Sequence, residues 1–491
     1  MARDRLNAPL VQPNGSPRLT ITGTEAGGFT IVLLIGFLLR CHGLTRGLIY
    51  DEIFSAMHFV DVDSMWATVS SYLYFNNQIA YSILARLSED IFGRHEWSLR
   101  LPALLLGMAS LPCLWIYSRP LVGPKLALGA TLGLAISPAH VAYSETARGY
   151  TGMILFSLLS TDFFFKLLAR PTKIRGCIYI FVNVINLYFH LYGIFVIAIQ
   201  MLVVGVLSLK RTGNDSSEFS INPKDFRTLW LSFPAIAFFA GVLYSPVMLQ
   251  FYHSIVARGT GTFDPTFGIK VLAKLSGSVG VPLQVVIALL IVLGWGALFR
   301  RRRREAIYFA LLLLLPVCLI WIIHPFDAYP RFFFYFLPFH ILLLVYGIAT
   351  LWRSGLQHHR TLRWLTSGAA IILALIVSQN WVLNSWQRLP TSGFRDAVVQ
   401  AESGIDASTV LCGIGGGAEL FRYYATRPVF IPESLDQFEE LMRGTSPVIC
   451  LATPYPDDKS RSDEHDKIRN FLVANFRSST AQEMTIFSSP E

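Results

Sequence analysis

Long hydrophobic runs alternate with short polar segments along most of this chain. Each run is close to the roughly 20 residues that an α-helix needs to cross a lipid bilayer. The runs lie at residues 26–44, 101–117, 126–142, 150–168, 177–209, 229–249, 284–299, 306–323, 332–351 and 362–382. The run at 177–209 would make a helix of about 50 Å, so we expect it to form two short spans with His190 at the turn.

The apolar stretch at 71–93 is interrupted by Arg86, Glu89 and Asp90, and the charges of the other loops decide whether it crosses. If it does not cross, the basic loops fall on the same side as the basic N-terminus, as the positive-inside rule requires. These loops carry Arg119 and Lys125; Arg170, Lys173 and Arg175; Lys210, Arg211, Lys224 and Arg227; Arg300 to Arg304; and Arg353, Arg360 and Arg363.

The charge pattern therefore predicts an all-α polytopic bundle of about eleven transmembrane helices, spanning residues 1–389. Its N-terminus would be cytoplasmic and its C-terminus outside the cell's inner (plasma) membrane. Residues 45–98 would form a long outer loop with amphipathic helices that lie on the membrane.

The composition supports a membrane protein. Hydrophobic residues make up 53% of the 491 residues and charged residues only 15%, so the apolar surface exceeds what one soluble core can bury. The net charge of +9 is better explained by basic cytoplasmic loops than by nucleic-acid binding. The six cysteines show no CxxC or Cys/His spacing, so no metal site is predicted.

The composition changes after about residue 390, where strand-like and helix-like segments alternate. This pattern predicts a small extracytoplasmic α/β domain over 390–491. Within it, the turn GIGGGAE lacks the ending that phosphate-binding loops require, so a plain tight turn is favoured. Cys412 and Cys450 would pair if their strands were neighbours.

The interiors of the predicted spans are nearly free of charge, which argues against an ion-coupled transporter. The remaining polar side chains lie in the predicted outer loops. They are Asp51, Glu52 and His58; Glu145, Arg148 and Tyr150; His190 and Tyr192; and His324, Asp327 and Arg331. A concave outer face would bring them together.

Each of these groups has a functional and a structural interpretation. Adjacent carboxylates at 51 and 52 suit a general base and its partner, or a solvated acidic loop. Arg148 and Arg331 suit bidentate binding of a phosphate, or interfacial anchoring. His190 suits a ligand-orienting or a core role. The aromatic residues of YPRFFFYF favour an interfacial belt over a sugar-binding platform.

Several segments in order resemble the family 39 (protein O-mannosyltransferase-like) membrane glycosyltransferases. LLRCHGLTRGLIYDEIFSA is similar to the family's first span and Asp-Glu pair. FGRHEWSLRLPALLLGMASLPCLWIY, SPAHVAYSETARGY and FHLYG resemble later segments, and YPRFFFYFLP is a looser match. The chain departs from the family at NNQIAYSIL, where many relatives have a proline-containing entry to a surface helix.

The resemblance implies a GT-C glycosyltransferase that moves a sugar from a polyprenyl-phosphate donor to an acceptor lipid, protein or glycan outside the membrane. It implies Asp51 as general base with Glu52 beside it, Arg148 and Arg331 on the donor phosphate, and inversion at the sugar. Glu145, Tyr150, His190 and Tyr192 would then line the substrate site. No cofactor is predicted beyond the lipid-linked donor, and the sequence leaves a divalent-metal requirement open.

Two other hypotheses remain at this stage. A transporter or scramblase of lipid-linked sugars would need polar residues running through the bundle. A noncatalytic partner in envelope polysaccharide assembly would fit the departure at NNQIAYSIL.

Overall fold

The computed structural model describes residues 22–73, 76–209, 223–258, 263–277, 279–323, 328–355, 368, 371–372, 375–383, 393–403, 405–444, 446–454 and 462–488. The chain divides into two units. We call Met1–His42 with Pro102–Arg388 the membrane unit, and Gly43–Leu101 with Leu389–Glu491 the sheet unit. Each is described by itself.

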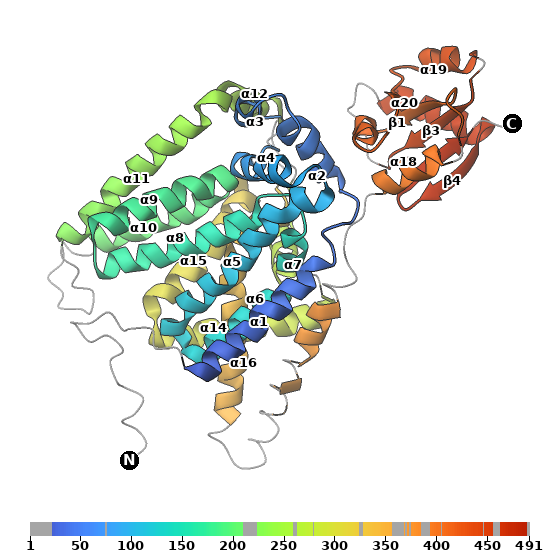
Figure 1. The fold of residues 1–491 in the computed structure, drawn as a ribbon. Helices are drawn as coiled ribbons and strands as arrows, with labels where there is room; N and C mark the ends of the chain where they lie inside the picture. The colour runs from blue at the N-terminus through green and yellow to red at the C-terminus, as the bar shows by residue number, and fades with distance from the viewer. Residues whose placement is uncertain are drawn as a thin grey trace, which may run out of the picture. The chain divides into compact units, whose positions relative to one another are not determined.

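The membrane unit is a bundle of helices (Figure 1). They are α1 (Gly23–Cys41), α5 (Glu96–Val122), which begins in the sheet unit, α6 (Pro124–Ile136), α7 (Pro138–Ser144), α8 (Tyr150–Ala169), α9 (Lys173–Phe189), α10 (Gly193–Leu209), α11 (Pro223–Tyr244), α12 (Met248–Arg258), α13 (Phe267–Leu275), α14 (Val281–Arg301), α15 (Arg303–Ile323), the 3₁₀ segment η5 (Pro330–Phe336) and α16 (Leu337–Gly355). Residues 375–383 are also helical.

Each predicted apolar run contains helix where the structure describes it. Seven helices among the described residues are long and apolar enough to span a bilayer, and an eighth is counted if α6 and α7 form one span bent by 57°. The bend has a local cause, because Pro138 begins α7 and proline suits the first turn of a helix rather than its interior. The predicted total of eleven is not confirmed.

The predicted division of the run at 177–209 is confirmed. α9 ends at Phe189 and α10 begins at Gly193, so His190 lies in the turn between them. Buried polar side chains join these helices to their neighbours. Gln200 of α10 donates to Ser160 of α8 at 3.0 Å and to the Tyr308 hydroxyl of α15 at 3.2 Å.

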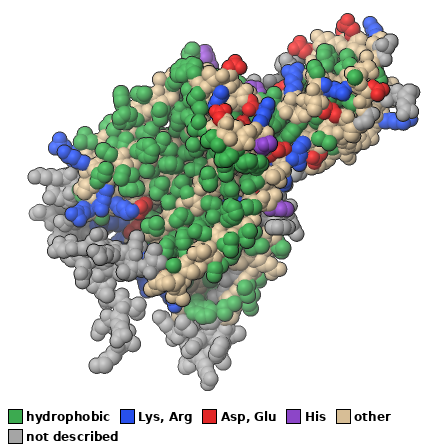
Figure 2. Space-filling model, in the orientation of Figure 1, with side chains coloured by type: hydrophobic (Ala, Val, Ile, Leu, Met, Phe, Trp, Pro, Cys, Tyr) green, Lys and Arg blue, Asp and Glu red, His purple; other side chains and the backbone are tan. Residues whose placement is uncertain are grey.

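Apolar side chains cover much of the visible face of the membrane unit (Figure 2). In α1, for example, Ile31, Leu34 and Leu38 are each more than half exposed. Such a surface is stable in lipid rather than in water, because contiguous exposed apolar area is rare on soluble proteins. The chain is therefore a multi-pass membrane protein.

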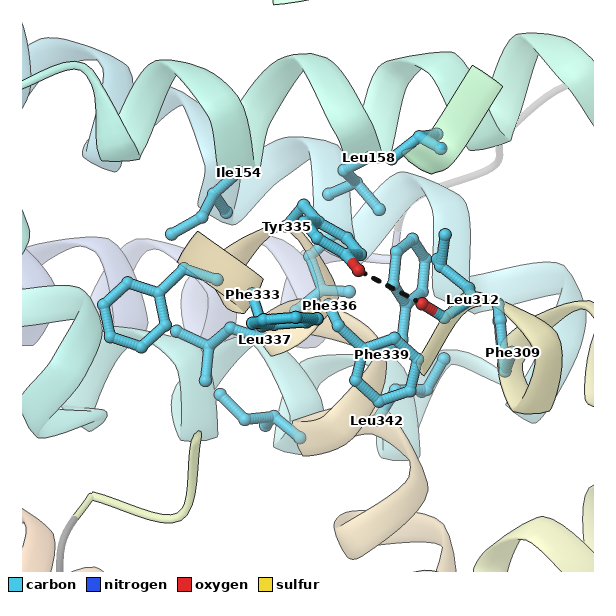
Figure 3. Close-up of a cluster of buried hydrophobic side chains, with 14 of the residues drawn as sticks. Ile154, Leu158, Phe309, Leu312, Phe333, Tyr335, Phe336, Leu337, Phe339 and Leu342 are labelled. Carbon is cyan, nitrogen blue, oxygen red and sulfur yellow. Dashed lines mark hydrogen bonds between the residues drawn. The ribbon is translucent and has the colours of Figure 1, made fainter. Parts of the chain in front are cut away.

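The aromatic segment η5 lies in the core of the membrane unit (Figure 3). Phe333, Phe334, Tyr335 and Phe336 are all buried, and the Tyr335 hydroxyl donates to the Leu312 carbonyl at 3.3 Å. The predicted interfacial belt is therefore wrong for these four rings, because helices α8, α13, α15 and α16 all pack around this segment.

The sheet unit begins with short helices. They are α2 (Tyr50–Ser55), the π-helical turn η2 (Ala56–Val60), α3 (Met65–Ser70) and α4 (Ile79–Phe92). With 14 residues, α4 is too short to cross a bilayer at about 1.5 Å per residue. The stretch at 71–93 therefore lacks a spanning helix, as the loop charges predicted.

The C-terminal part of the sheet unit is the predicted α/β domain. Its elements are α18 (Phe394–Glu402), β1 (Val410–Ile414), η6 (Ala418–Tyr423), β2 (Val429–Phe430), α19 (Leu435–Met442), β3 (Val448–Ala452), α20 (Ser462–Asn475), β4 (Arg477–Ala481) and β5 (Met484–Ser488). The strand order is β2-β1-β3-β5-β4. β2, β1 and β3 are parallel, and β5 and β4 are antiparallel to their neighbours.

The domain holds one strand that the sequence analysis missed, and its two cysteines lie on neighbouring strands without forming the disulfide that this arrangement would permit. β4 is mostly exposed and polar, so it has no alternating apolar pattern to reveal it. Cys412 and Cys450 lie opposite each other in the register of β1 and β3, and both are buried free thiols. Burial raises the pKa of Cys450, which keeps its thiol protonated.

Candidate active site

The loop from α7 to α8 carries the first group of predicted site residues. Glu145 follows the end of α7, and Arg148 lies two residues before the start of α8 at Tyr150. Their exposed fractions are only 2% for Glu145 and 5% for Arg148. A buried loop of this polarity must satisfy its charges internally or with a ligand.

His190 receives the electrostatic influence of both predicted phosphate-binding arginines. Its Nδ1 accepts a hydrogen bond from the backbone N–H of Tyr192 at 3.2 Å, so its ring proton is assigned to Nε2. Burial, together with the positive charges of Arg148 and Arg331, lowers the pKa of His190 to about 3. The imidazole is therefore neutral at physiological pH and can donate from Nε2.

Aromatic rings surround this histidine. Its ring centroid lies 5.3 Å from that of Tyr150, 5.6 Å from that of Tyr192 and 5.2 Å from that of Phe332. The guanidinium of Arg331 lies 4.6 Å from the centroid of the Tyr329 ring. We call Arg148, Arg331, His190, Tyr150 and Tyr192 the arginine–histidine site. The structure thus brings together five of the eight predicted site residues.

A buried arginine that the sequence analysis did not assign to the site holds the α6–α7 bend in place. Arg40 at the end of α1 donates to the carbonyls of Gly36 and Ala135 at 2.6 and 2.8 Å, and to the Ser144 hydroxyl at 3.1 Å. It also contacts His140. These bonds join α1 to both parts of the bent pair, directly before Glu145, so Arg40 positions the loop that carries Arg148.

Of the remaining three predicted residues, Glu145 lies in the loop before α8, and Asp51 and Glu52 lie in the first turn of α2 in the sheet unit. Glu52 makes a bidentate ion pair with Arg100, with bonds of 2.8 and 2.6 Å. Both side chains are buried, at 1% and 2% exposure. Glu52 also accepts the Ile49 N–H at 2.9 Å and so caps its own helix. Its role in the fold is to fix α2.

Asp51 is half-buried, and its carbonyl accepts the Ser55 hydroxyl at 2.8 Å. The predicted proximity of Asp51 to Arg148 and Arg331 stays a prediction. His58 bonds the Phe54 carbonyl at 2.9 Å within the same helical segment. His324 and Asp327 lie outside the described residues.

The departure from the family at NNQIAYSIL has a structural role. The Asn77 side chain is buried, and its amide donates to the carbonyls of Thr68 and Ser71 at 3.0 and 2.7 Å. Its side-chain oxygen accepts the Ser82 hydroxyl at 2.7 Å. Asn77 therefore ties α3 to the start of α4, and the chain makes this turn with side-chain hydrogen bonds.

A second acidic pair lies in the sheet unit. Asp61 binds Arg94 at 2.5 Å, and burial together with the nearby Asp61 carboxylate raises the pKa of Glu89 to about 8. Among the described residues, no group of three or more His, Cys, Asp and Glu side chains is placed to hold a metal ion. The raised pKa favours the protonated form of the Glu89 carboxyl group.

This pair predicts a pH-dependent stability. The folded chain keeps Glu89 protonated from its ordinary pKa of about 4.5 up to about 8, whereas the unfolded chain ionises it, so stability falls as pH rises through this window. The Glu89→Gln variant has no such proton, and we expect a flatter profile of thermal midpoint against pH between 5 and 8. The exposed Glu483→Gln variant is the control, and equal slopes in both variants and the wild type would contradict the prediction.

The apolar bundle defines a multi-pass membrane protein, and the arginine–histidine site is its candidate ligand site. Comparisons with known proteins narrow this class. Residues 78–212 match the family described as Dolichyl-phosphate-mannose-protein mannosyltransferase. A stretch of 84 residues is 32% identical to YkcB of Bacillus subtilis strain 168, which carries the provisional name of mannosyltransferase. That stretch is 17% of this chain and 12% of the relative's own length.

Solved structures share the fold of nearly the whole chain. ArnT from Cupriavidus metallidurans matches with a TM-score of 0.62 at 13% identity in the apo state, and 0.60 at 12% identity bound to undecaprenyl phosphate. Each match covers 95% of this chain and 98% of the ArnT chain. The oligosaccharyltransferase AglB from Archaeoglobus fulgidus, in complex with an inhibitory peptide and a dolichol-phosphate, matches at 0.54 and 10% identity over 88% of this chain and 69% of its own.

These likenesses show that the chain has the GT-C fold of membrane glycosyltransferases. The resemblance that the sequence motifs suggested is therefore confirmed at the level of the fold, and over residues 78–212 at the level of sequence.

Proposed function

We propose that this chain is an inverting glycosyltransferase that moves a sugar from a polyprenyl-phosphate donor to an acceptor hydroxyl on the extracytoplasmic side of the membrane. One observation carries the proposal: the buried His190 ring lies among aromatic rings and within reach of the charges of Arg148 and Arg331. The fold agrees, because one structural neighbour is described as bound to undecaprenyl phosphate.

The arginine–histidine site suits the phosphate of such a donor. Guanidinium groups bind phosphate oxygens with short, charge-assisted hydrogen bonds, and the Nε2–H of a neutral His190 adds a donor without a competing charge. When the bond between the anomeric carbon and the phosphate oxygen breaks, negative charge grows on the departing polyprenyl phosphate. Fixed positive groups in a buried site stabilise that charge strongly.

Asp51 would remove the proton from the acceptor hydroxyl as its oxygen attacks the anomeric carbon in line with the leaving phosphate. A single in-line displacement inverts the configuration at that carbon. Glu52, held by Arg100, would keep α2 and hence Asp51 in place. Glu145, Tyr150 and Tyr192 would contact the sugar or its phosphate.

We assign the donor to the polyprenyl-phosphate hexoses or pentoses, and the acceptor to a lipid, protein or glycan of the cell envelope. Basic residues in alternate loops support an N-terminus in the cytoplasm and a C-terminus outside the inner membrane. In this orientation the site faces the extracytoplasmic side, where no nucleotide sugar is expected. A lipid-linked donor is therefore favoured.

The proposal predicts that Arg148→Gln and Arg331→Gln each weaken binding of undecaprenyl phosphate by about 10- to 100-fold, because hydrogen bonds to charged groups contribute about 1.5–3 kcal/mol. Binding is measured on the full chain in nanodiscs with undecaprenyl phosphate as the titrated lipid.

Arg175→Gln is the matched control for this measurement. Arg175 binds the carbonyls of Lys166 and Arg170 at 3.2 and 2.7 Å, and it lies near the start of α9, the opposite end from His190. Unchanged affinity in both site variants would refute the phosphate assignment, as would an equal loss in the control.

A further inference from the structure

The segment from Thr45 to Glu52 is held by the C-terminal domain as well as by its own neighbours. The Leu48 N–H donates to the Tyr424 hydroxyl at 2.8 Å. Arg395 of α18 donates to the Thr45 carbonyl at 3.0 Å and to the Glu96 carboxylate at 3.1 Å. Two side chains of the domain thus bind backbone groups at both ends of a four-residue stretch that leads into α2.

The glycine-rich turn GIGGGAE provides a third contact. Gly417 has φ of +77°, and a Cβ placed there would lie 2.3 Å from Cε2 of Tyr50. The Tyr50 ring also lies 6.5 Å from the Phe394 ring, centroid to centroid. Two features require a glycine at position 417. They are the left-handed backbone conformation and the close approach of the Tyr50 ring.

The position of this turn in the sheet is informative. It follows β1, whose neighbours β2 and β3 run parallel to it, so it lies at the carboxyl edge of the parallel strands. Open α/β sheets ordinarily bind their ligands at that edge. Here the Tyr50 ring packs against the turn, and Tyr50 is the residue directly before Asp51.

The other side of the segment is bonded to Arg100. This side chain donates to the carbonyls of Gly43, Leu44, Arg46 and Gly47 at 3.0, 3.0, 2.6 and 3.2 Å, besides its ion pair with Glu52. The backbone that approaches α2 is therefore fixed from two directions, by Arg100 and by the C-terminal domain.

We infer that the C-terminal α/β domain is a positioning element for the acidic turn of α2, and that Tyr424, Arg395 and Gly417 are positioning residues for Asp51. This inference rests on the proposed function for its catalytic consequence only. Sheets of this kind ordinarily bind a ligand at the carboxyl edge of their parallel strands. In this domain that edge contacts the start of α2. Removing these contacts should increase the mobility of the backbone at Asp51 without removing any group that is proposed to bind the donor phosphate.

The test uses the full chain in detergent micelles with Tyr424→Phe, Arg395→Gln and the double variant. Each lost hydrogen bond should speed hydrogen exchange of the amides of residues 45–55 by about 2- to 10-fold, and the double variant by more. Arg443→Gln is the control, because Arg443 directly follows α19 and its side chain is 80% exposed. Arg395→Lys retains the charge and should recover part of the protection.

The same variants are assayed for release of polyprenyl phosphate from polyprenyl-phosphate mannose, the donor tested first because residues 78–212 match a mannosyltransferase family. We expect kcat to fall about 10-fold in the double variant, with an unchanged KM for the donor. Unchanged exchange at residues 45–55 in the double variant overturns the inference. If Asp51→Asn abolishes transfer, a double variant with faster exchange but the kcat of the wild type also overturns the inference.

Failure of the proposed function has a different signature. If Asp51→Asn transfers sugar at the wild-type rate while exchange at residues 45–55 still rises in the double variant, the general-base assignment falls. The contact between the C-terminal domain and α2 is then supported as a structural one.

Discussion

The Asp51→Asn variant is expected to transfer sugar about 10²- to 10⁴-fold more slowly than the wild type, the contribution typical of a general base. Asparagine has nearly the volume of aspartate, so the half-buried position and the helical turn should be preserved. The variant cannot accept the acceptor's proton, whereas the groups that bind the phosphate are unchanged. The loss should therefore appear in kcat, with undecaprenyl phosphate binding intact.

Asp63→Asn is the matched control for this measurement. Asp63 is an exposed carboxylate in the same segment between α1 and α5, twelve residues along the chain. Wild-type turnover in Asp51→Asn would refute the base assignment, as would an equal loss in Asp63→Asn. A loss of both turnover and undecaprenyl phosphate binding in Asp51→Asn would assign the residue to donor binding rather than proton transfer.

The second large effect is expected on stability. Glu52→Gln should lower the free energy of unfolding by about 3–5 kcal/mol, because removing one partner of a buried ion pair leaves an uncompensated charge. That charge is on Arg100, which is 2% exposed. The free energy is measured by chemical unfolding of the full chain in detergent, followed by tryptophan fluorescence.

The double variant Glu52→Gln, Arg100→Met checks the cause. Removing the unpaired charge of Arg100 should recover part of the lost stability. Replacing a buried ion pair with neutral groups of similar volume often changes the free energy of unfolding very little. A loss below about 1 kcal/mol in Glu52→Gln would match a solvated pair and contradict the buried geometry. These predictions assign the two adjacent acids separable roles, with Asp51 expected to affect turnover and Glu52 expected to affect folding.

Much of the fold could be predicted from local patterns. Apolar runs of about twenty residues locate helices because an unpaired backbone is too costly inside lipid, and those runs contain helix wherever the structure describes them. The polar FHLYG turn divides its run at His190 because the run is too long for one span. Alternating apolar positions located four of the five strands, and β4 was missed because its residues are exposed and polar.

The sequence indicated individual candidate residues of the site but not which of them lie close together. The residue types and their place at the ends of apolar runs made Arg148, His190 and Arg331 candidates. That the charges of both arginines reach His190 follows from the packing of α8 against α9 and against η5. Arg100, by contrast, had no local sign of its role, because its partner Glu52 lies 48 residues away along the chain.

Hydropathy and charge along the chain determined that this is a membrane bundle with a C-terminal α/β domain, because burial in lipid and the 3.6-residue and 2-residue periods are properties of neighbouring residues. Only the tertiary structure decided that the rings of η5 are core, that Glu52 is held by Arg100, and that the glycine-rich turn packs on Tyr50. Each of these features depends on a contact between residues far apart in the sequence. The free energy of such a contact cannot be predicted from the pattern of neighbouring residues.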